Sequence, residues 1–114
     1  MLTRVSHCPI EGAMILLSGR WRALILYYLN QGPMRFNALR RANPGLSQQM
    51  LTRELRALET AGVITRTVYP EVPPRVEYAL TAAGERLMPI IGQLSAWWAS
   101  TQDHREADTR ENAA

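Results

Sequence analysis

The spacing of leucines predicts a helix over residues 48–61. Three leucines fall on one side of this helix when residues are placed about 100° apart, and the other side is polar. These leucines are Leu51, Leu55 and Leu58. Ser47 is placed to cap the N-terminus, and Gly62 suits the left-handed conformation that ends a helix. The pattern indicates an amphipathic helix with one face in the core.

Alternating apolar and polar residues predict two strands, at residues 64–69 and 76–80. Three prolines between them limit the connection to a loop, so the two strands form a hairpin. Arg75 is expected at the tip, where Pro73 and Pro74 stiffen the chain and lower the entropy lost on binding. The same prolines also protect an edge strand from pairing with another chain.

The position of Arg66 is ambiguous in this pattern. Arg66 has the same parity as Ile64 and Val68, so strict alternation places it on the Ile64 side of the strand. Either the strand is bulged there or Arg66 lies at the edge of the core. Arg75 is therefore the stronger candidate for a contact made by the hairpin.

The whole pattern predicts a mainly α-helical fold with a small β-hairpin (α+β), in one domain at residues 8–101. Residues 1–7 are expected to form a flexible arm, and residues 102–114 a disordered tail. Thr81 caps the last helix, which Pro89 bends or divides. The other expected elements are helices at 9–17, 21–29, 37–42 and 82–100 and a short strand or helix entry at 34–36. The second of these helices is expected to carry Leu24, Ile25, Tyr28 and Leu29 on one side.

Length and composition fit one small globular domain. The chain has 114 residues, of which 46% are hydrophobic, and all thirteen of its basic residues are arginine. Genomic codon bias accounts for much of the absence of lysine. Residues 1–80 carry a net charge of +5 and residues 81–114 a net charge of −2, so the positive excess coincides with the helix and the hairpin. This distribution fits a polyanionic partner.

The cysteine count and the hydropathy pattern favour a cytoplasmic protein. The single cysteine excludes an internal disulfide framework and suits a reducing compartment. The longest early apolar run, at residues 13–17, is too short for a signal-peptide core or a membrane span. We therefore expect no membrane partner.

The polar side of helix 48–61 carries side chains of the kinds that recognise DNA bases. Glutamine pairs with adenine, arginine pairs with guanine, and threonine contacts a thymine methyl group or a phosphate. Arginines outside this helix can anchor the DNA backbone. The candidate DNA contacts are Arg35, Arg40, Arg41, Ser47, Gln48, Gln49, Thr52, Arg53, Arg56 and Arg75. Periodicity alone fits an ordinary solvated helix face equally well, and solubility alone explains single surface arginines.

Several sequence blocks occur in the order found in one family. They are Cys8-Pro9-Ile10-Glu11, Gly19-Arg20-Trp21, Gly32-Pro33-Met34-Arg35-Phe36, Leu46-Ser47-Gln48-Gln49-Met50-Leu51-Thr52, Leu55-Arg56-Ala57-Leu58-Glu59, Gly62-Val63-Ile64, Val72-Pro73-Pro74-Arg75-Val76-Glu77-Tyr78 and Leu80-Thr81-Ala82-Ala83-Gly84. Over residues 8–98 the chain closely resembles the HxlR-type family of bacterial transcriptional regulators, which are related to the MarR group.

This resemblance implies a winged helix-turn-helix protein that binds a near-palindromic operator in double-stranded DNA as a homodimer. Helix 48–61 would enter the major groove, and residues 69–76 would form the wing, which lies on the DNA backbone or in the minor groove. The first helix and the last helix, at 82–101, would form the dimer interface. Its expected residues are Leu16, Leu87, Ile90, Ile91, Leu94, Trp97 and Trp98. This much apolar surface exceeds what one small domain can cover, although packing within one subunit is the alternative.

Cys8 is a possible sensor, because some family members respond to oxidants, quinones or aldehydes through a cysteine at this position. A helix N-terminus favours the reactive thiolate in general, and His7 adjoins the thiol. The effector would then be a small oxidant or electrophile. Alternatively, Cys8 is a small buried cap residue without a sensory role.

No pattern in the sequence indicates catalysis or a cofactor. One cysteine and two distant histidines do not make a metal site, and neither a glycine-rich phosphate loop nor a nucleophile elbow is present. The main alternative to DNA binding is a winged-helix protein–protein adaptor. A small redox enzyme is a weaker alternative, since a lone cysteine has no resolving partner.

Overall fold

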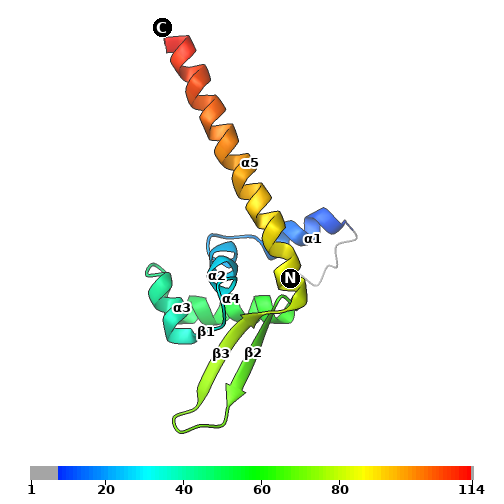
Figure 1. Ribbon diagram of the computed structural model, residues 1–114, viewed down its shortest axis with the longest axis vertical. Helices are drawn as coiled ribbons and strands as arrows, with labels where there is room; N and C mark the ends of the chain where they lie inside the picture. The colour runs from blue at the N-terminus through cyan, green and yellow to red at the C-terminus, as the bar shows by residue number, and fades with distance from the viewer. Residues whose placement is uncertain (1–7, 114) are drawn as a thin grey trace.

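The computed structural model describes residues 8–113, and the side chains of residues 8–103. The arm expected at residues 1–7 lies outside the described residues. In chain order the elements are α1 (Pro9–Leu16), α2 (Arg22–Leu29), β1 (Met34–Arg35), α3 (Phe36–Ala42), α4 (Gln48–Thr60), β2 (Ile64–Tyr69), β3 (Arg75–Leu80) and α5 (Ala82–Ala113). Figure 1 shows that the β2–β3 hairpin and α5 project from opposite sides of the helices. The predicted mainly α-helical fold with a small hairpin is confirmed.

The three strands form one antiparallel sheet in the order β1-β3-β2. Strands β2 and β3 pair residue for residue from Ile64 opposite Leu80 to Tyr69 opposite Arg75. This unbroken register leaves no bulge at Arg66, which lies opposite Tyr78. Arg66 is therefore on the same side of the hairpin as Ile64, at the edge of the core, and this was one of the two alternatives left open by the sequence.

The core lies between α2, α3, α4 and the base of the hairpin. The three leucines of α4 are buried as predicted, together with Leu39 of α3 and Ile64 of β2. On α2 the buried residues are Ile25, Leu26 and Leu29, whereas Leu24 is exposed and Tyr28 is only half-buried. The side of α2 that the pattern groups together therefore coincides only partly with its buried side. This helix packs against α3, β3 and α5, and these contacts rather than its own short pattern determine which side is covered.

A buried asparagine holds the turn between α3 and α4. The Nδ2 of Asn43 donates a hydrogen bond to the carbonyl oxygen of Leu39 at 2.8 Å, and the backbone N–H of Leu46 donates to the carbonyl oxygen of Asn43 at 3.0 Å. Ser47 then caps α4, because its Oγ accepts a hydrogen bond from the backbone N–H of Met50 at 3.1 Å. These bonds fix α4 relative to α3.

A close joint connects the start of α5 to the end of α4. The Oγ1 of Thr81 donates to the carbonyl oxygen of Gly62 at 2.7 Å and accepts from the backbone N–H of Gly84 at 3.1 Å. The backbone N–H of Thr81 donates to the carbonyl oxygen of Val63 at 3.0 Å. A Cβ atom at Gly84 would collide with the Val63 carbonyl oxygen, so only glycine fits here without a backbone shift. The positive φ of Gly62 makes the turn at this joint.

The last helix is longer than the sequence predicted. α5 is continuous through Pro89 to Ala113, so the end expected at about Ser100 and the disordered tail expected at residues 102–114 are wrong for the described part, up to 113. Neither glycine nor proline occurs after Gly92, and alanine, the residue that most favours helix, is the commonest in the segment that follows. The polar composition that suggested a loose tail is equally that of a solvated helix.

Candidate nucleic-acid interface

The polar face of α4 presents the predicted base-contacting residues together. Gln48, Gln49, Arg53 and Arg56 are exposed and line a shallow hollow with Thr52. The Oγ1 of Thr52 donates to the carbonyl oxygen of Gln48 at 2.9 Å, so this hydroxyl is engaged within its own helix. These five side chains project from a helix that the core and the Asn43 turn hold in place.

Most arginines on this side of the molecule have no internal partner. Among the side chains of residues 8–103, ion pairs and side-chain hydrogen bonds of arginine are confined to Arg22 and Arg75. The exposed arginines outside these bonds include Arg35, Arg40, Arg41, Arg53, Arg56 and Arg66. Their charges are not compensated within the chain, and this is the electrostatic condition for attracting a polyanion.

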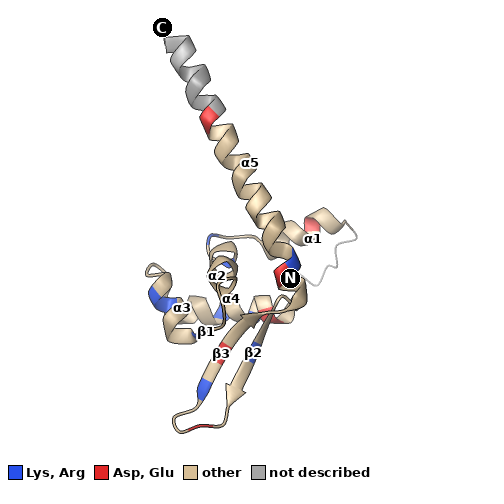
Figure 2. Ribbon diagram, viewed as in Figure 1, with Lys and Arg blue, Asp and Glu red and all other residues tan. Residues whose placement is uncertain are grey.

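Arginines at the C-terminal end of α3 form a second basic site. Arg40 and Arg41 line a small hollow of about 310 Å³ with Asn37, Pro44 and Leu46, beside the turn that leads into α4. Figure 2 shows their positive charge at the tip of α3. Arg35 is separate from both hollows, since it lies on β1 opposite Glu77 of β3.

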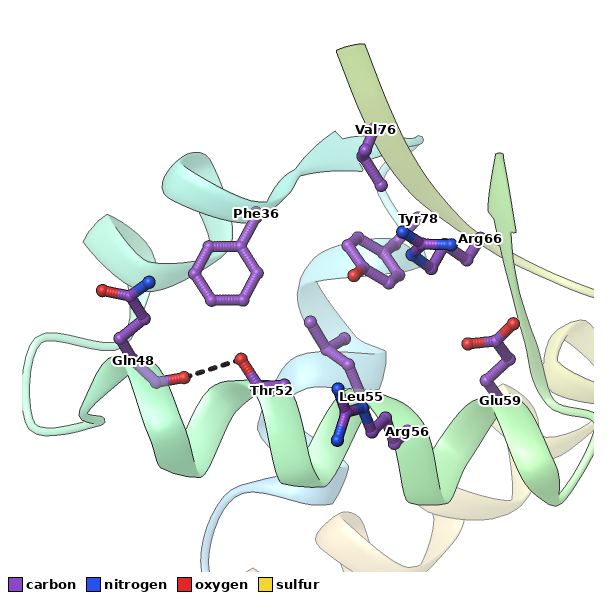
Figure 3. A pocket seen from close by; sticks show the side chains of 9 residues that line it. All are labelled: Phe36, Gln48, Thr52, Leu55, Arg56, Glu59, Arg66, Val76 and Tyr78. Atoms are coloured by element: carbon purple, nitrogen blue, oxygen red, sulfur yellow. Dashed lines mark hydrogen bonds between the residues drawn. The ribbon is translucent and has the colours of Figure 1, made fainter. Parts of the chain in front are cut away.

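A groove separates α4 from the hairpin (Figure 3). It has a volume of about 540 Å³, and its lining residues are Phe36, Gln48, Thr52, Leu55, Arg56, Glu59, Arg66, Val76 and Tyr78. Arg66 enters this groove from β2 and faces the side that carries Arg56 of α4. Arg75 was the stronger candidate from the sequence, although the parity of Arg66 with Ile64 already indicated that Arg66 lies on this side of the strand.

Arg75 is not at the tip of the hairpin and is not free. It begins β3, where its Nη2 lies 3.0 Å from Glu71 Oε2 and its Nη1 lies 3.2 Å from Glu77 Oε2. Its guanidinium group also covers the ring of Tyr69, with 4.0 Å between Cζ and the ring centroid, and its side chain is only 28% exposed. The expectation that Arg75 projects is therefore corrected, because two carboxylates and a ring hold it against the hairpin.

The wing consequently has no net charge. Its tip, residues 70–74, contains no cation and one carboxylate, that of Glu71, while Arg66 and Glu77 lie on the strands. The positive and negative residues alternate along the hairpin in Figure 2. The uncompensated positive charge of this surface therefore belongs to the arginines of α3 and α4 and to Arg35 and Arg66.

Exposed apolar side chains lie on α5, as the sequence predicted, and on α1. Trp97 is 60% exposed and Trp98 is 55% exposed, and Ile90 and Leu94 are also exposed. Leu16, Leu87 and Ile91 are instead partly buried and pack against the core of their own chain. On α1 the large exposed apolar residues are Ile10, Met14 and Ile15. They were not among the interface residues expected from the sequence, although they share a short apolar helix.

Cys8 is the N-cap residue of α1, and it is exposed rather than buried. Residues 8–103 contain no group of three or more histidine, cysteine, aspartate or glutamate side chains that could hold a metal ion. Within the described residues, moreover, none of the helices has the length and hydrophobicity needed to cross a membrane.

A short helix, a tight turn, a second helix with an exposed cationic face and a β-hairpin define a winged helix-turn-helix protein. The model of the HxlR-like helix-turn-helix family matches residues 16–106, and the chain belongs to this family. It is 46% identical over 99 residues to an HTH-type transcriptional regulator of Methanothermobacter thermautotrophicus, covering 87% of this chain and 76% of that protein. The chain is thus a member of a family of transcriptional regulators rather than of enzymes.

Solved structures agree with this assignment. The redox regulator HypR in its reduced form has a TM-score of 0.80 and 41% identity, with 88% of this chain and 99% of that chain covered. The reduced form of the transcriptional regulator YodB from Bacillus subtilis has a TM-score of 0.74 and 39% identity, with 81% and 91% covered. The chain is therefore similar in fold and sequence to two regulators solved in a reduced form.

Proposed function

We propose that this chain is a homodimeric regulator that binds a near-palindromic operator with α4 in the major groove. The observation that carries this proposal is the exposed face of α4, where two glutamines and two arginines without internal partners lie together. Glutamine pairs with adenine and arginine with guanine, and the first half of such a helix makes the base contacts in helix-turn-helix proteins.

Backbone contacts on either side of α4 would fix its register on DNA. Arg40 and Arg41 are placed to meet the phosphates on one side. On the other side the wing approaches the backbone or the minor groove, and Arg66 is the cation that the wing contributes to the groove between the wing and α4. Arg75 would have to break its ion pairs with Glu71 and Glu77 before it could bind a phosphate. Its contribution to DNA affinity is therefore expected to be smaller than that of Arg66.

Dimerisation would bring two such surfaces to one operator. The exposed apolar residues of α1 and α5 need a cover, and a second copy of the same helices provides one through a two-fold axis. A two-fold dimer then presents its two recognition helices about 34 Å apart, one turn of DNA.

Cys8 is the proposed site of a response to a small oxidant or electrophile. It is exposed on α1, a helix of the proposed dimer interface, so a modified thiol there can change how two subunits meet. YodB, a relative in structure, has been solved after diamide treatment and with a bound quinone. The test is operator binding by wild type and Cys8→Ser with and without a mild oxidant, and equal responses of the two proteins exclude Cys8 as the sensor.

The DNA-binding proposal is tested by footprinting the purified protein on the DNA upstream of its own gene. Binding should protect two half-sites one helical turn apart and should weaken steeply with salt, because each phosphate contact releases counterions. The protein–protein adaptor predicts no duplex binding even at low salt. Such a result would overturn the proposal and favour the adaptor.

A further inference from the structure

Arg22 joins three helices through one guanidinium group. From the start of α2, its Nε donates to both carboxylate oxygens of Glu54 on α4, at 3.1 and 3.4 Å. Its Nη1 donates to the carbonyl oxygens of Ile15 and Leu16 at the end of α1, at 3.3 and 3.2 Å. The side chains of Arg22 and Glu54 are only 19% and 17% exposed, so water competes little for these bonds.

The two helices joined in this way have different roles in the proposed function. α1 carries exposed apolar residues of the proposed dimer surface, while α4 carries the candidate base contacts, with Arg53 directly before Glu54. At the end of α1 the carbonyl oxygen of Ile15 also accepts from the backbone N–H and the Oγ of Ser18, at 3.2 and 2.7 Å. The carbonyl oxygen of Leu16 accepts from Arg22, and the carbonyl groups at a helix C-terminus attract a cation. Arg22 occupies that place and holds a carboxylate of α4 at the same time.

We propose that Arg22 is a positioning residue, which through Glu54 sets the angle of α4 relative to α1 and thereby the spacing of the two recognition helices in the dimer. This inference rests on the proposed DNA-binding dimer. It assigns Arg22 and Glu54 no contact with DNA, and it predicts an effect on the binding of two half-sites together rather than on the contact with each one.

The chemistry of the bridge requires arginine. A guanidinium group is planar and has five N–H donors, so it can satisfy a carboxylate with one edge and backbone carbonyls with the other. A lysine ammonium is a point charge on a flexible stem and cannot hold both partners in a fixed geometry. Arg22→Lys therefore keeps the charge but is expected to behave like Arg22→Gln.

The experiment compares two duplexes. The first is the two-half-site duplex that the wild-type protein selects from a random-sequence pool, and the second is the same duplex with one half-site scrambled. The measured quantity is the ratio of the two affinities. We expect this ratio to fall about tenfold in Arg22→Gln, Arg22→Lys and Glu54→Gln, a typical size for coupling between two sites.

Charge changes alone cannot give this result. Arg22→Gln removes a positive charge and Glu54→Gln removes a negative one, so their general effects on DNA affinity are opposite, whereas the ratio should fall in both. The matched controls are Arg20→Gln, next to the bridge in sequence but exposed, and Glu85→Gln, exposed at the start of α5. Neither control should change the ratio.

Thermal unfolding establishes that each variant is folded at the assay temperature. If Arg22→Gln does not fold, the isosteric Glu54→Gln decides the matter. An unchanged ratio in the folded bridge variants overturns the positioning role and leaves DNA binding intact. If the wild-type protein selects no duplex at all, the proposed function fails, and the positioning role fails with it.

Discussion

The arginines among residues 8–103 differ in their environments. Arg22 is mostly buried and connects helices, Arg75 is held by two carboxylates and a ring, and those on α4 are exposed without partners. A guanidinium group pairs well with carboxylates and with phosphates, so its partner within the chain decides whether it remains available. The availability of each arginine for DNA is therefore set by the carboxylates near it.

Replacing Arg53 with alanine should relax sequence preference. Arg53 is exposed on α4 and has no internal partner, so its loss should cost roughly 1–3 kcal/mol at the base pair that it contacts and little elsewhere. The measurement is binding to a set of duplexes that differ by single base pairs, with Arg86→Ala on the exposed side of α5 as the control. Unchanged affinity and unchanged preference would show that the assignment of α4 to the major groove is wrong.

Arg66 and Arg75 should differ in their contribution to binding. Arg66→Ala should weaken all duplexes about equally and reduce the slope of log affinity against log salt by about one, because one phosphate contact is lost. Arg75→Ala should change the affinity less, since the Arg75 guanidinium group is already neutralised by Glu71 and Glu77. Salt titrations of both variants measure this, and a larger effect of Arg75→Ala would contradict the proposed wing contact.

At the scale of single residues, the roles that depend on near neighbours in the chain were predicted correctly from the sequence. The cap at Ser47 and the turn at Gly62 depend on the helix end itself, and both are present. The bonds of Arg75 depend on the pairing of β2 with β3 and on the path of the loop, which the pattern alone does not provide. The bridge from Arg22 to Glu54 joins residues 32 positions apart and leaves no trace in local periodicity.

At the scale of the elements, the joint between α4 and α5 is closely packed. Gly84 lies against the backbone of Val63, so the connection has no room for a side chain. By contrast, Gly92 of the same helix has nothing within 4 Å of the position that a Cβ would take. Substitutions of Gly84 and Gly92 by alanine can therefore be compared, since the same methyl group meets an obstacle at one position and none at the other.

Gly84→Ala should lower the free energy of unfolding by about 1–3 kcal/mol, because the added methyl group forces a backbone shift at the joint. Gly92→Ala should instead raise it by up to about 1 kcal/mol, since alanine is the better helix former and meets no obstacle. Urea denaturation at fixed protein concentration measures both. Equal stabilities of Gly84→Ala and the wild type would mean that the joint adapts to a side chain.

The elements with a strong period were the ones that the sequence predicted well. The bounds of α4 and of β2 agree with the pattern within a residue, because leucines at helical spacing and alternating apolar residues are each compatible with few structures. The pattern did not identify the buried side of α2, because eight residues, most of them apolar, give a weak pattern. The end of α5 was wrong because a polar sequence looks the same in a solvated helix and in a loose tail.

For the whole molecule, the exposed apolar residues of α1 and α5 predict the oligomeric state. Trp97→Glu places a charge in the centre of the exposed surface of α5 and should weaken dimerisation about 30-fold or more, as the loss of an interface hot spot does. Sedimentation velocity over a concentration series measures this. The control is Val72→Glu, since Val72 is fully exposed at the wing tip and should leave the dimer unchanged. A wild-type protein that stays monomeric at all concentrations would contradict the proposed dimer.

The unbroken course of α5 also has a mechanical consequence. The joint at Gly84 is closely packed, and Trp98 lies about 21 Å further along the helix at 1.5 Å per residue. Because α5 is continuous between Gly84 and Trp98, a displacement of the helix at Trp98 would turn the domain that carries α4. A sideways displacement of about 2 Å at Trp98 corresponds to a rotation of about 5° at the joint, by the same helix geometry. In the proposed dimer, small changes in the angle between the two α5 helices would therefore change the orientation of α4.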